Sequence, residues 1–170
     1  DGTREFVKRN GEFTVNIAEV KDGIPVAGAV YAPVVSKLYF GGADGAFEVK
    51  ARPGKPIGPR AARRIRVRKP PAKGWVAATS RSHPDPQTDE YLKRFPIART
   101  IVAGSSLKFC LVAAGEADIY ARAGRTMEWD TAAGQAVLLA AGGSMTLWDG
   151  TPFTYGKPGF ENPAFVARGK

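Results

Sequence analysis

The sequence predicts an α/β fold, and more closely an α+β layered sandwich in which helices pack on sheets. Residues 1–60 hold short runs of alternating apolar and polar side chains around turn signals, which is typical of antiparallel strands. Residues 61–170 alternate strand-like with helix-like segments. An apolar fraction of 44% in 170 residues is enough for a hydrophobic core. We therefore expect an antiparallel β subdomain over residues 1–60 and an α/β subdomain over residues 61–170, with the Pro- and Gly-rich segment 51–60 at the boundary.

The first subdomain is predicted to contain one short helix and an antiparallel meander. The helix begins at Thr3 and ends at Gly11. Lys21-Asp22-Gly23 is a hairpin signal, so the strands on either side of it should pair. The predicted strands cover residues 13–20, 25–32, 38–40 and 46–49.

The second subdomain is predicted to alternate strands and helices. Its first strand, residues 64–68, alternates arginine with an apolar residue, which indicates one buried and one solvated face. The clearest helix has Asp130 at its N-cap and Gly142 beyond its end. A terminal hairpin is expected around Asp149-Gly150. The other strands cover residues 75–80, 98–103 and 117–122, and the helices cover residues 86–95, 105–115 and 130–143.

The net charge of +9 indicates attraction to anions, and much of it lies in residues 59–73. This stretch has three interpretations: the charged outer face of an edge strand, a patch that attracts an anionic substrate, or a nucleic-acid surface. No apolar run is long enough to span a membrane.

The scarcity of cysteine and histidine excludes several classes of site. With one cysteine, Cys110, no internal disulfide can form, and without a signal segment a reducing cytoplasm is expected. Cys110 lies on an apolar helix face and is expected in the core, as are Phe6 and Phe13. The single His83 excludes zinc sites built from several histidines. Neither a GxSxG elbow nor a phosphate-binding GxxxxGK[ST] loop is present.

Two places join an aspartate to a predicted helix start: Asp1-Gly2-Thr3 and Trp129-Asp130-Thr131. A helix N-terminus suits phosphate, and a carboxylate there can hold a hard cation through oxygen. If the two starts converge, they form a place where phosphate and Mg²⁺ can meet. The plainer interpretation is that each aspartate is only a helix cap.

Four segments carry a resemblance to the inositol monophosphatase superfamily. DGTREFVKRNGEFTVNIA resembles the second half of the family's Asp-Pro-x-Asp-Gly-Thr signature, and WDTAAGQAVLLAAGG resembles its second signature. GSSLKFCLVAAGEADIYARAG and TSRSH are similar to the CysQ-type branch, which hydrolyses 3′(2′),5′-bisphosphate nucleotides. The resemblance covers nearly the whole chain and implies an αβαβα sandwich, here lacking the N-terminal helices and first strands.

The resemblance implies metal and substrate roles for residues at both predicted helix starts. Asp1 and Asp130 match metal ligands, with Mg²⁺ as the cofactor, and Asp130 also faces the substrate. Gly2 and Thr3 match positions whose main-chain N–H groups hold the scissile phosphate. The Thr3 hydroxyl matches one that orients the attacking water, so Thr3 and Asp1 are the catalytic candidates. Glu128 has no assigned role.

The resemblance also implies that His83, Ser105, Lys108 and Arg122 surround the nucleotide and its unreactive phosphate. Each has a plainer interpretation. Lys108 and Arg122 can be ordinary surface cations, His83 can be merely exposed before Pro84, and Ser105 can be only a helix cap.

The implied function is Mg²⁺-dependent hydrolysis of adenosine 3′,5′-bisphosphate to AMP and phosphate, in sulfur assimilation and nucleotide recycling, with inhibition by Li⁺. The implied location is the cytoplasm, or the cytoplasmic face of the inner membrane without a membrane span. The partner is then a small nucleotide rather than nucleic acid. Two alternatives stay open: an inositol monophosphatase acting on sugar phosphates, and a non-catalytic basic module that binds anions or nucleic acid through residues 59–73.

The chain begins inside the first signature. The family's first aspartate, its proline and an upstream glutamate that ligates metal have no counterpart here. We therefore expect the 170 residues alone to bind Mg²⁺ poorly and to show little activity, which the upstream segment should restore. We also expect the chain to associate with that segment or to form a homo-oligomer, because apolar surface would otherwise be uncovered.

Overall fold

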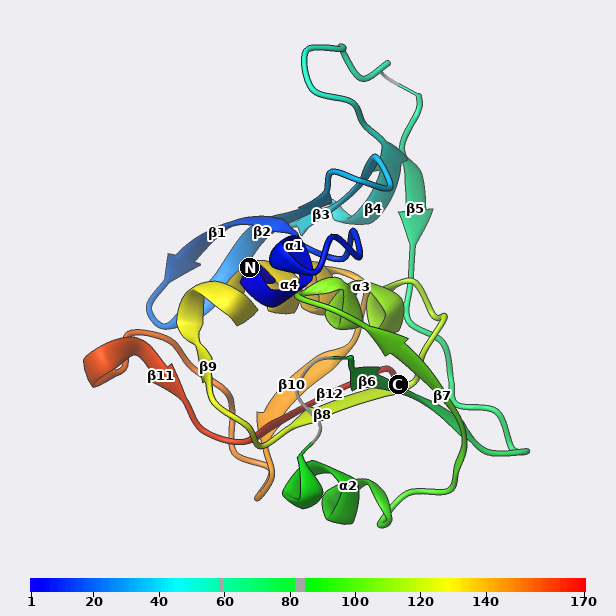
Figure 1. The fold of residues 1–170 in the computed structure, drawn as a ribbon, viewed down its shortest axis with the longest axis vertical. Helices are drawn as coiled ribbons and strands as arrows, with labels where there is room; N and C mark the ends of the chain where they lie inside the picture. Colours follow the sequence, from blue (N-terminus) through cyan, green and yellow to red (C-terminus); the bar gives the residue numbers. More distant parts are fainter. Residues whose placement is uncertain (59, 82–84) are drawn as a thin grey trace.

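The fold is a stack of layers, and the computed structural model describes it for residues 1–58, 60–81 and 85–170. A helical layer of α3 (Leu107–Ala113) and α4 (Glu128–Ala140) lies between two five-stranded sheets (Figure 1). A further helix, α2 (Pro86–Leu92), lies beyond the second sheet, and α1 (Thr3–Val7) lies close to the starts of α3 and α4. The predicted layered α/β sandwich is confirmed.

The first sheet is an antiparallel meander, as the turn signals predict. Asp22 and Gly23 have φ angles of 50° and 76°, the left-handed values that a two-residue hairpin turn requires. The strands follow chain order: β1 (Val15–Lys21), β2 (Ile24–Ala32), β3 (Lys37–Gly42), β4 (Gly45–Lys50) and β5 (Arg63–Ile65).

The predicted strand at residues 64–68 is shorter than expected, since β5 ends at Ile65. Beyond it the chain leaves the first sheet: the Val67 N–H donates to the Ala141 carbonyl at the end of α4, at 3.1 Å. Arg68 then forms a two-armed ion pair with the fully buried Asp118 carboxylate at 2.7 and 2.9 Å. Because β5 belongs to the first sheet, that sheet reaches beyond residue 60. The division into units of residues 1–60 and 61–170 stays a prediction.

The second sheet contains both parallel and antiparallel pairs, and the sequence did not predict β12, the strand nearest the C-terminus. β6 pairs in parallel with β7 and β8, while β12 is antiparallel to β8 and β10. The expected hairpin around Asp149-Gly150 is reduced to a tight turn, in which the Leu147 N–H donates to the Thr151 carbonyl at 2.9 Å and an isolated antiparallel bridge joins Thr146 to Pro152. The strand partner of β10 is instead β12. The sheet order is β10 (Ser144–Leu147), β12 (Phe165–Arg168), β8 (Ile119–Arg122), β6 (Trp75–Ser80) and β7 (Ile97–Ala103). A small ladder joins β9 (Thr126–Met127) to β11 (Glu161–Asn162), which follows a 3₁₀ turn at Pro158–Phe160.

Asp130 is not the N-cap of α4, contrary to the prediction. The helix begins two residues earlier, and Met127 is the N-cap. Asp130 is the third helical residue, and its Oδ2 accepts a hydrogen bond of 2.9 Å from the Met127 N–H. The carboxylate therefore supports the helix start from within the first turn, as the acidic residue of a capping box does.

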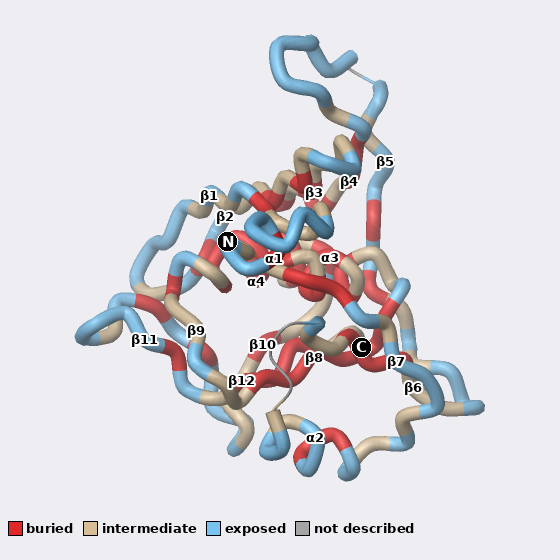
Figure 2. The backbone as a smooth tube through the Cα atoms, in the orientation of Figure 1, coloured by how far each residue is buried: buried red, intermediate tan, exposed pale blue. Residues whose placement is uncertain are grey.

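The core surrounds α3 and α4, which Figure 2 shows as buried along most of their length. Cys110 is fully buried, as predicted. Phe6 is 62% exposed, so its expected place in the core is wrong; its ring packs against Phe13 at the surface, at 5.1 Å. None of the helices in the described ranges combines the length and the apolar character needed to cross a membrane.

Backbone contact between β2 and α4 gives a stability prediction. A Cβ atom on Gly28 would lie 2.6 Å from the Ala133 carbonyl oxygen and 2.8 Å from the Ala136 Cβ. We expect Gly28→Ala to lower the free energy of unfolding by about 1–3 kcal/mol, because the helix must move away from the sheet. Gly58→Ala is the matched control, since a Cβ there meets nothing within 4 Å. Urea denaturation measures both, and equal stabilities of the two variants would contradict this packing.

Candidate active site

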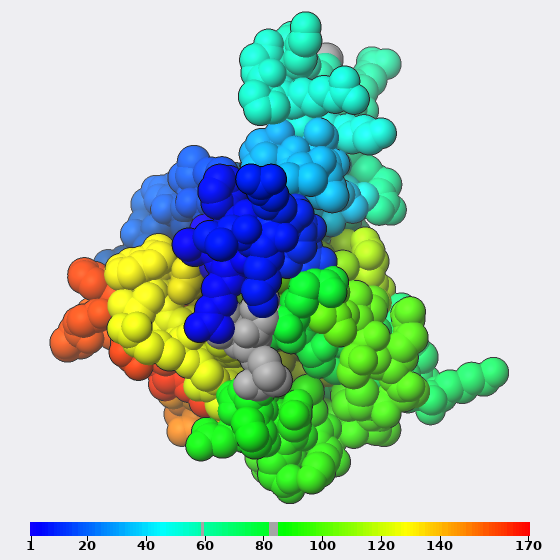
Figure 3. Space-filling model, viewed as in Figure 1, coloured from blue at the N-terminus to red at the C-terminus, as the bar shows by residue number. Residues whose placement is uncertain are grey.

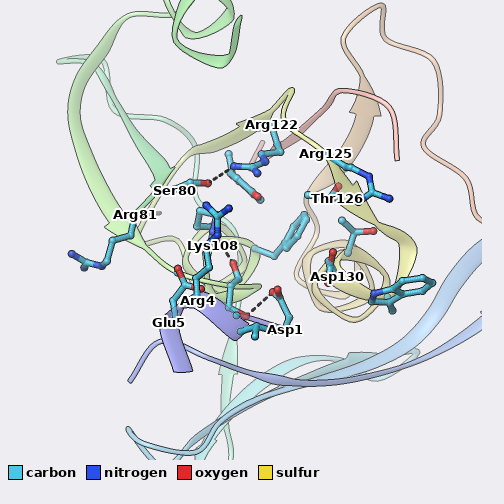
Figure 4. A pocket seen from close by; sticks show the side chains of 18 residues that line it. Asp1, Arg4, Glu5, Ser80, Arg81, Lys108, Arg122, Arg125, Thr126 and Asp130 are labelled. Carbon is cyan, nitrogen blue, oxygen red and sulfur yellow. Dashed lines mark hydrogen bonds between the residues drawn. The ribbon is translucent and has the colours of Figure 1, made fainter. Parts of the chain in front are cut away.

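A pocket of about 420 Å³ opens at one end of the helical layer (Figure 4). The N-terminal residues, the ends of β6 and β8, and the starts of α3 and α4 all contribute to its lining. Figure 3 shows the blue N-terminal residues beside the yellow residues at the start of α4. The predicted site residues that line the pocket are Asp1, Gly2, Thr3, Ser105, Lys108, Arg122 and Asp130. His83 lies outside the described residues.

Asp1 is held in place through its main chain. Its nitrogen donates to the Thr14 carbonyl at 2.9 Å, and the Thr14 N–H donates back at 3.0 Å. Gly2 then turns the chain into α1 with a φ of 90°, which favours glycine. A Cβ on Gly2 would also lie 3.0 Å from Phe13 Cα, so the turn has no room for a side chain.

The Asp1 carboxylate contacts two serine hydroxyls at the start of α3. Ser105 Oγ donates to Asp1 Oδ2 at 2.6 Å, and Ser106 Oγ lies 3.1 Å from the same oxygen. Ser106 Oγ is also 2.8 Å from the main-chain carbonyl of Asp130. The two acidic residues, 129 positions apart in sequence, therefore contact one hydroxyl.

Lys108 is a buried cation of the pocket and not a surface lysine. It is 4% exposed, and its Nζ donates to the Ser105 carbonyl at 2.7 Å and to the Ala103 carbonyl at 3.2 Å. The ammonium lies 5.1 Å from the centre of the Tyr120 ring. Burial, with the charge of Arg122 as the second cause, lowers the pKa of Lys108 to about 7. Its charge therefore depends on what enters the pocket.

Arg122 is also buried, at 7% exposure, so its interpretation as a surface residue is wrong. Its Nε donates to the Gly124 carbonyl at 3.1 Å and one terminal nitrogen donates to Ser80 Oγ at 3.0 Å. Figure 4 shows the Arg122 and Lys108 side chains on one side of the pocket and Asp1 and Asp130 on another. We call the end with Asp1 and Asp130 the acidic part and the end with Lys108 and Arg122 the cationic part. The separation is not complete, because the buried Glu5 also lines the pocket near Lys108 and Arg125 lines it near Asp130.

Several residues of the pocket and its rim were not predicted. Arg81 forms a two-armed ion pair with Glu12 at 2.7 and 2.8 Å, and Glu12 also accepts the Gly104 N–H at 2.8 Å. The Arg81 side chain lowers the pKa of Glu12. TSRSH could have indicated Arg81, but no local pattern marks Glu12. Glu128 accepts the Gly156 and Lys157 N–H groups, which gives it a structural role.

The donor set is compatible with Mg²⁺. Within the described ranges no group of three or more acidic, histidine or cysteine side chains forms a metal-binding cluster. Mg²⁺, however, is usually bound through one or two carboxylates together with water and substrate phosphate. Asp1 and Asp130 supply two carboxylates to one pocket. Both serine hydroxyls contact Asp1 Oδ2, and no hydrogen bond from a described residue is found on Asp1 Oδ1, so that oxygen could serve as a metal ligand.

The chain is thus a layered α/β protein, in which two sheets enclose a helical layer and a pocket lined by acidic and basic side chains opens at one end of that layer. The chain belongs to the inositol monophosphatase family, because a model of that family matches residues 1–168.

The curated relatives are longer than this chain. It is 45% identical over 166 residues to the 3′(2′),5′-bisphosphate nucleotidase CysQ of Salmonella typhimurium, a match that covers 97% of this chain and 63% of the relative. The values for CysQ of Escherichia coli K12 are the same. The crystal structure of CysQ from Bacteroides thetaiotaomicron, a bacterial member of the inositol monophosphatase family, superposes with a TM-score of 0.87 at 39% identity, covering all of this chain and 67% of that one.

Proposed function

We propose that the protein to which these residues belong hydrolyses adenosine 3′,5′-bisphosphate to AMP and inorganic phosphate. The names of the CysQ relatives support the substrate class. The observation that carries the proposal is the composition of one pocket, which contains two aspartates and two buried cations.

The division of the pocket suits a substrate with two phosphates. Each phosphate monoester bears a charge of about −1.5 to −2 at neutral pH. The phosphate to be cleaved would lie at the acidic part, where Asp1 and Asp130 would hold Mg²⁺. The unreactive phosphate would lie at the cationic part and pair with Lys108 and Arg122, as charge-assisted hydrogen bonds favour.

The chemistry needs positioning more than covalent participation by the protein. A water oxygen forms a bond to phosphorus while the bond to the 3′-oxygen breaks, and the leaving oxygen gains a proton that the water gives up. Thr3 would orient the water through its hydroxyl, and Gly2 and Thr3 would hold the phosphate through their N–H groups. Bound Mg²⁺ would neutralise phosphate charge and lower the pKa of water.

Phosphate release in the complete gene product tests the proposal. We expect release from adenosine 3′,5′-bisphosphate to require Mg²⁺, with a kcat/KM at least about tenfold above that for inositol 1-phosphate, because a single charge-assisted hydrogen bond is worth ~1.5–3 kcal/mol. Faster turnover of inositol 1-phosphate would favour the inositol monophosphatase alternative. A nucleic-acid module would instead bind without Mg²⁺ and lose affinity steeply with salt.

A further inference from the structure

Ser105 and Ser106 at the start of α3 both depart from local backbone rules. Ser105 has a φ of 52°, a left-handed value that is uncommon outside glycine. Ser106 is the N-cap of α3, but its φ and ψ are −73° and −2° and its side chain makes no capping hydrogen bond. A serine cap normally stabilises a helix by about 1 kcal/mol. The plainer interpretation of Ser105 as only a helix cap is therefore wrong, and neither hydroxyl caps the helix.

Each hydroxyl instead lies in a hydrogen-bonded chain that ends at Asp1. One chain starts at Thr14, just before β1, and the other starts at Asn16 within β1. The Thr14 hydroxyl contacts the Ser105 hydroxyl, which donates to Asp1 Oδ2 at 2.6 Å. In the second chain, Asn16 Nδ2 donates to Ser106 Oγ at 2.9 Å. Since a hydroxyl carries one proton and accepts two hydrogen bonds, Ser106 can accept from Asn16 and share its proton between Asp1 Oδ2 and the Asp130 carbonyl.

Ser106 differs from Ser105 in burial and in its partners. It is 1% exposed, so a ligand in the pocket has little access to it. Its hydroxyl is the point at which the chain start, β1 and the first turn of α4 meet. A change at this hydroxyl would therefore act on the two aspartates and not on substrate directly.

We propose that Ser106 is a positioning residue whose hydroxyl sets the separation between Asp1 and Asp130, and thereby the metal affinity of the pocket. The proposal rests on the proposed function for the identity of the metal site. Without the hydroxyl, Asp1 keeps Ser105 as a donor, but the link to α4 is lost. No hydroxyl then links Asp1 to the main chain of Asp130, so the distance between the two carboxylates is less well fixed. Lys108 and Arg122 keep their hydrogen bonds.

The test measures Mn²⁺ binding by electron paramagnetic resonance, together with kcat and KM for adenosine 3′,5′-bisphosphate, in the complete gene product. We expect Ser106→Ala to weaken Mn²⁺ binding about 10-fold or more, because a hydrogen bond to a charged group is worth ~1.5–3 kcal/mol. Its kcat should fall at saturating substrate, with KM changing less than about twofold, since the cationic part is unaltered. Ser106→Thr, which keeps the hydroxyl, should recover most of the metal affinity.

The matched control is Ser144→Ala on β10, in the second sheet and outside the pocket lining, which should bind Mn²⁺ as the wild type does. Wild-type Mn²⁺ affinity in Ser106→Ala would overturn the proposal, as would a loss that Ser106→Thr does not recover. Wild-type protein that binds Mn²⁺ but releases no phosphate would overturn the proposed function alone, since the metal-binding arm would still decide the role of Ser106.

Discussion

Asp130→Asn is expected to lower the rate of phosphate release from adenosine 3′,5′-bisphosphate by about 100-fold or more in the complete gene product. The change removes one of the two carboxylate charges that would hold Mg²⁺, and electrostatic contributions of this size are common in active sites. Asparagine keeps an oxygen that can accept the Met127 N–H, so the start of α4 should stay intact.

Two comparisons separate lost chemistry from lost structure. The free energy of unfolding of Asp130→Asn should stay within about 0.5 kcal/mol of the wild type, because the supporting hydrogen bond is retained. Asp44→Asn removes the same charge from an exposed turn between β3 and β4 and should leave the rate unchanged. A variant at Asp130 that folds normally and hydrolyses at the wild-type rate would contradict a metal-binding role.

Much of the fold could be predicted because the local signals agree with the tertiary structure. The hairpin turn predicted at Asp22-Gly23 requires left-handed backbone angles, and both residues adopt them. The long apolar run of α4 could only be a buried helix, and Val137 and Leu138 are fully buried. The failure in the second sheet comes from long-range pairing: β12 lies between β10 and β8, and no local pattern says which strand residues 144–147 will join.

The site shows the same limit. The aspartates at two helix starts could be found by pattern, and the structure brings them to one pocket. Their supporting contacts could not be found, because they join residues distant in sequence: Ser106 and Asp1 are 105 positions apart, and Glu12 and Gly104 are 92 positions apart. For Ser105 the pattern left two interpretations open, and the one as only a helix cap is wrong, because its hydroxyl donates to the Asp1 carboxylate instead. Departures from local rules are expected where function competes with stability.

Lys108→Met is expected to lower kcat/KM for adenosine 3′,5′-bisphosphate by about 10–100-fold, the equivalent of one charge-assisted hydrogen bond. A phosphate monoester without the second phosphate should lose much less, because nothing would pair with Lys108. Lys93→Met is the matched control: its ammonium is exposed on the far side of the second sheet and pairs only with Glu90 among the described residues. Equal losses on both substrates would show that Lys108 supports the pocket without recognising the second phosphate.

The pH dependence of binding gives a sharper test of the same residue. The free protein holds the pKa of Lys108 at about 7, below its ordinary value of 10.5, through burial and the charge of Arg122. A bound phosphate offsets both effects and raises that pKa, so binding near pH 8 should take up a proton, and affinity should fall as pH rises above about 7. Calorimetric titration in two buffers with different ionisation enthalpies measures this uptake, which Lys108→Met should abolish.

The stability of the free protein should change with pH in the opposite direction to the binding affinity, because the buried charge of Lys108 destabilises the fold most below pH 7. Wild-type stability should therefore rise relative to Lys108→Met between about pH 7 and 10.5. A wild type that shows neither trend would mean that Lys108 stays charged in the empty pocket.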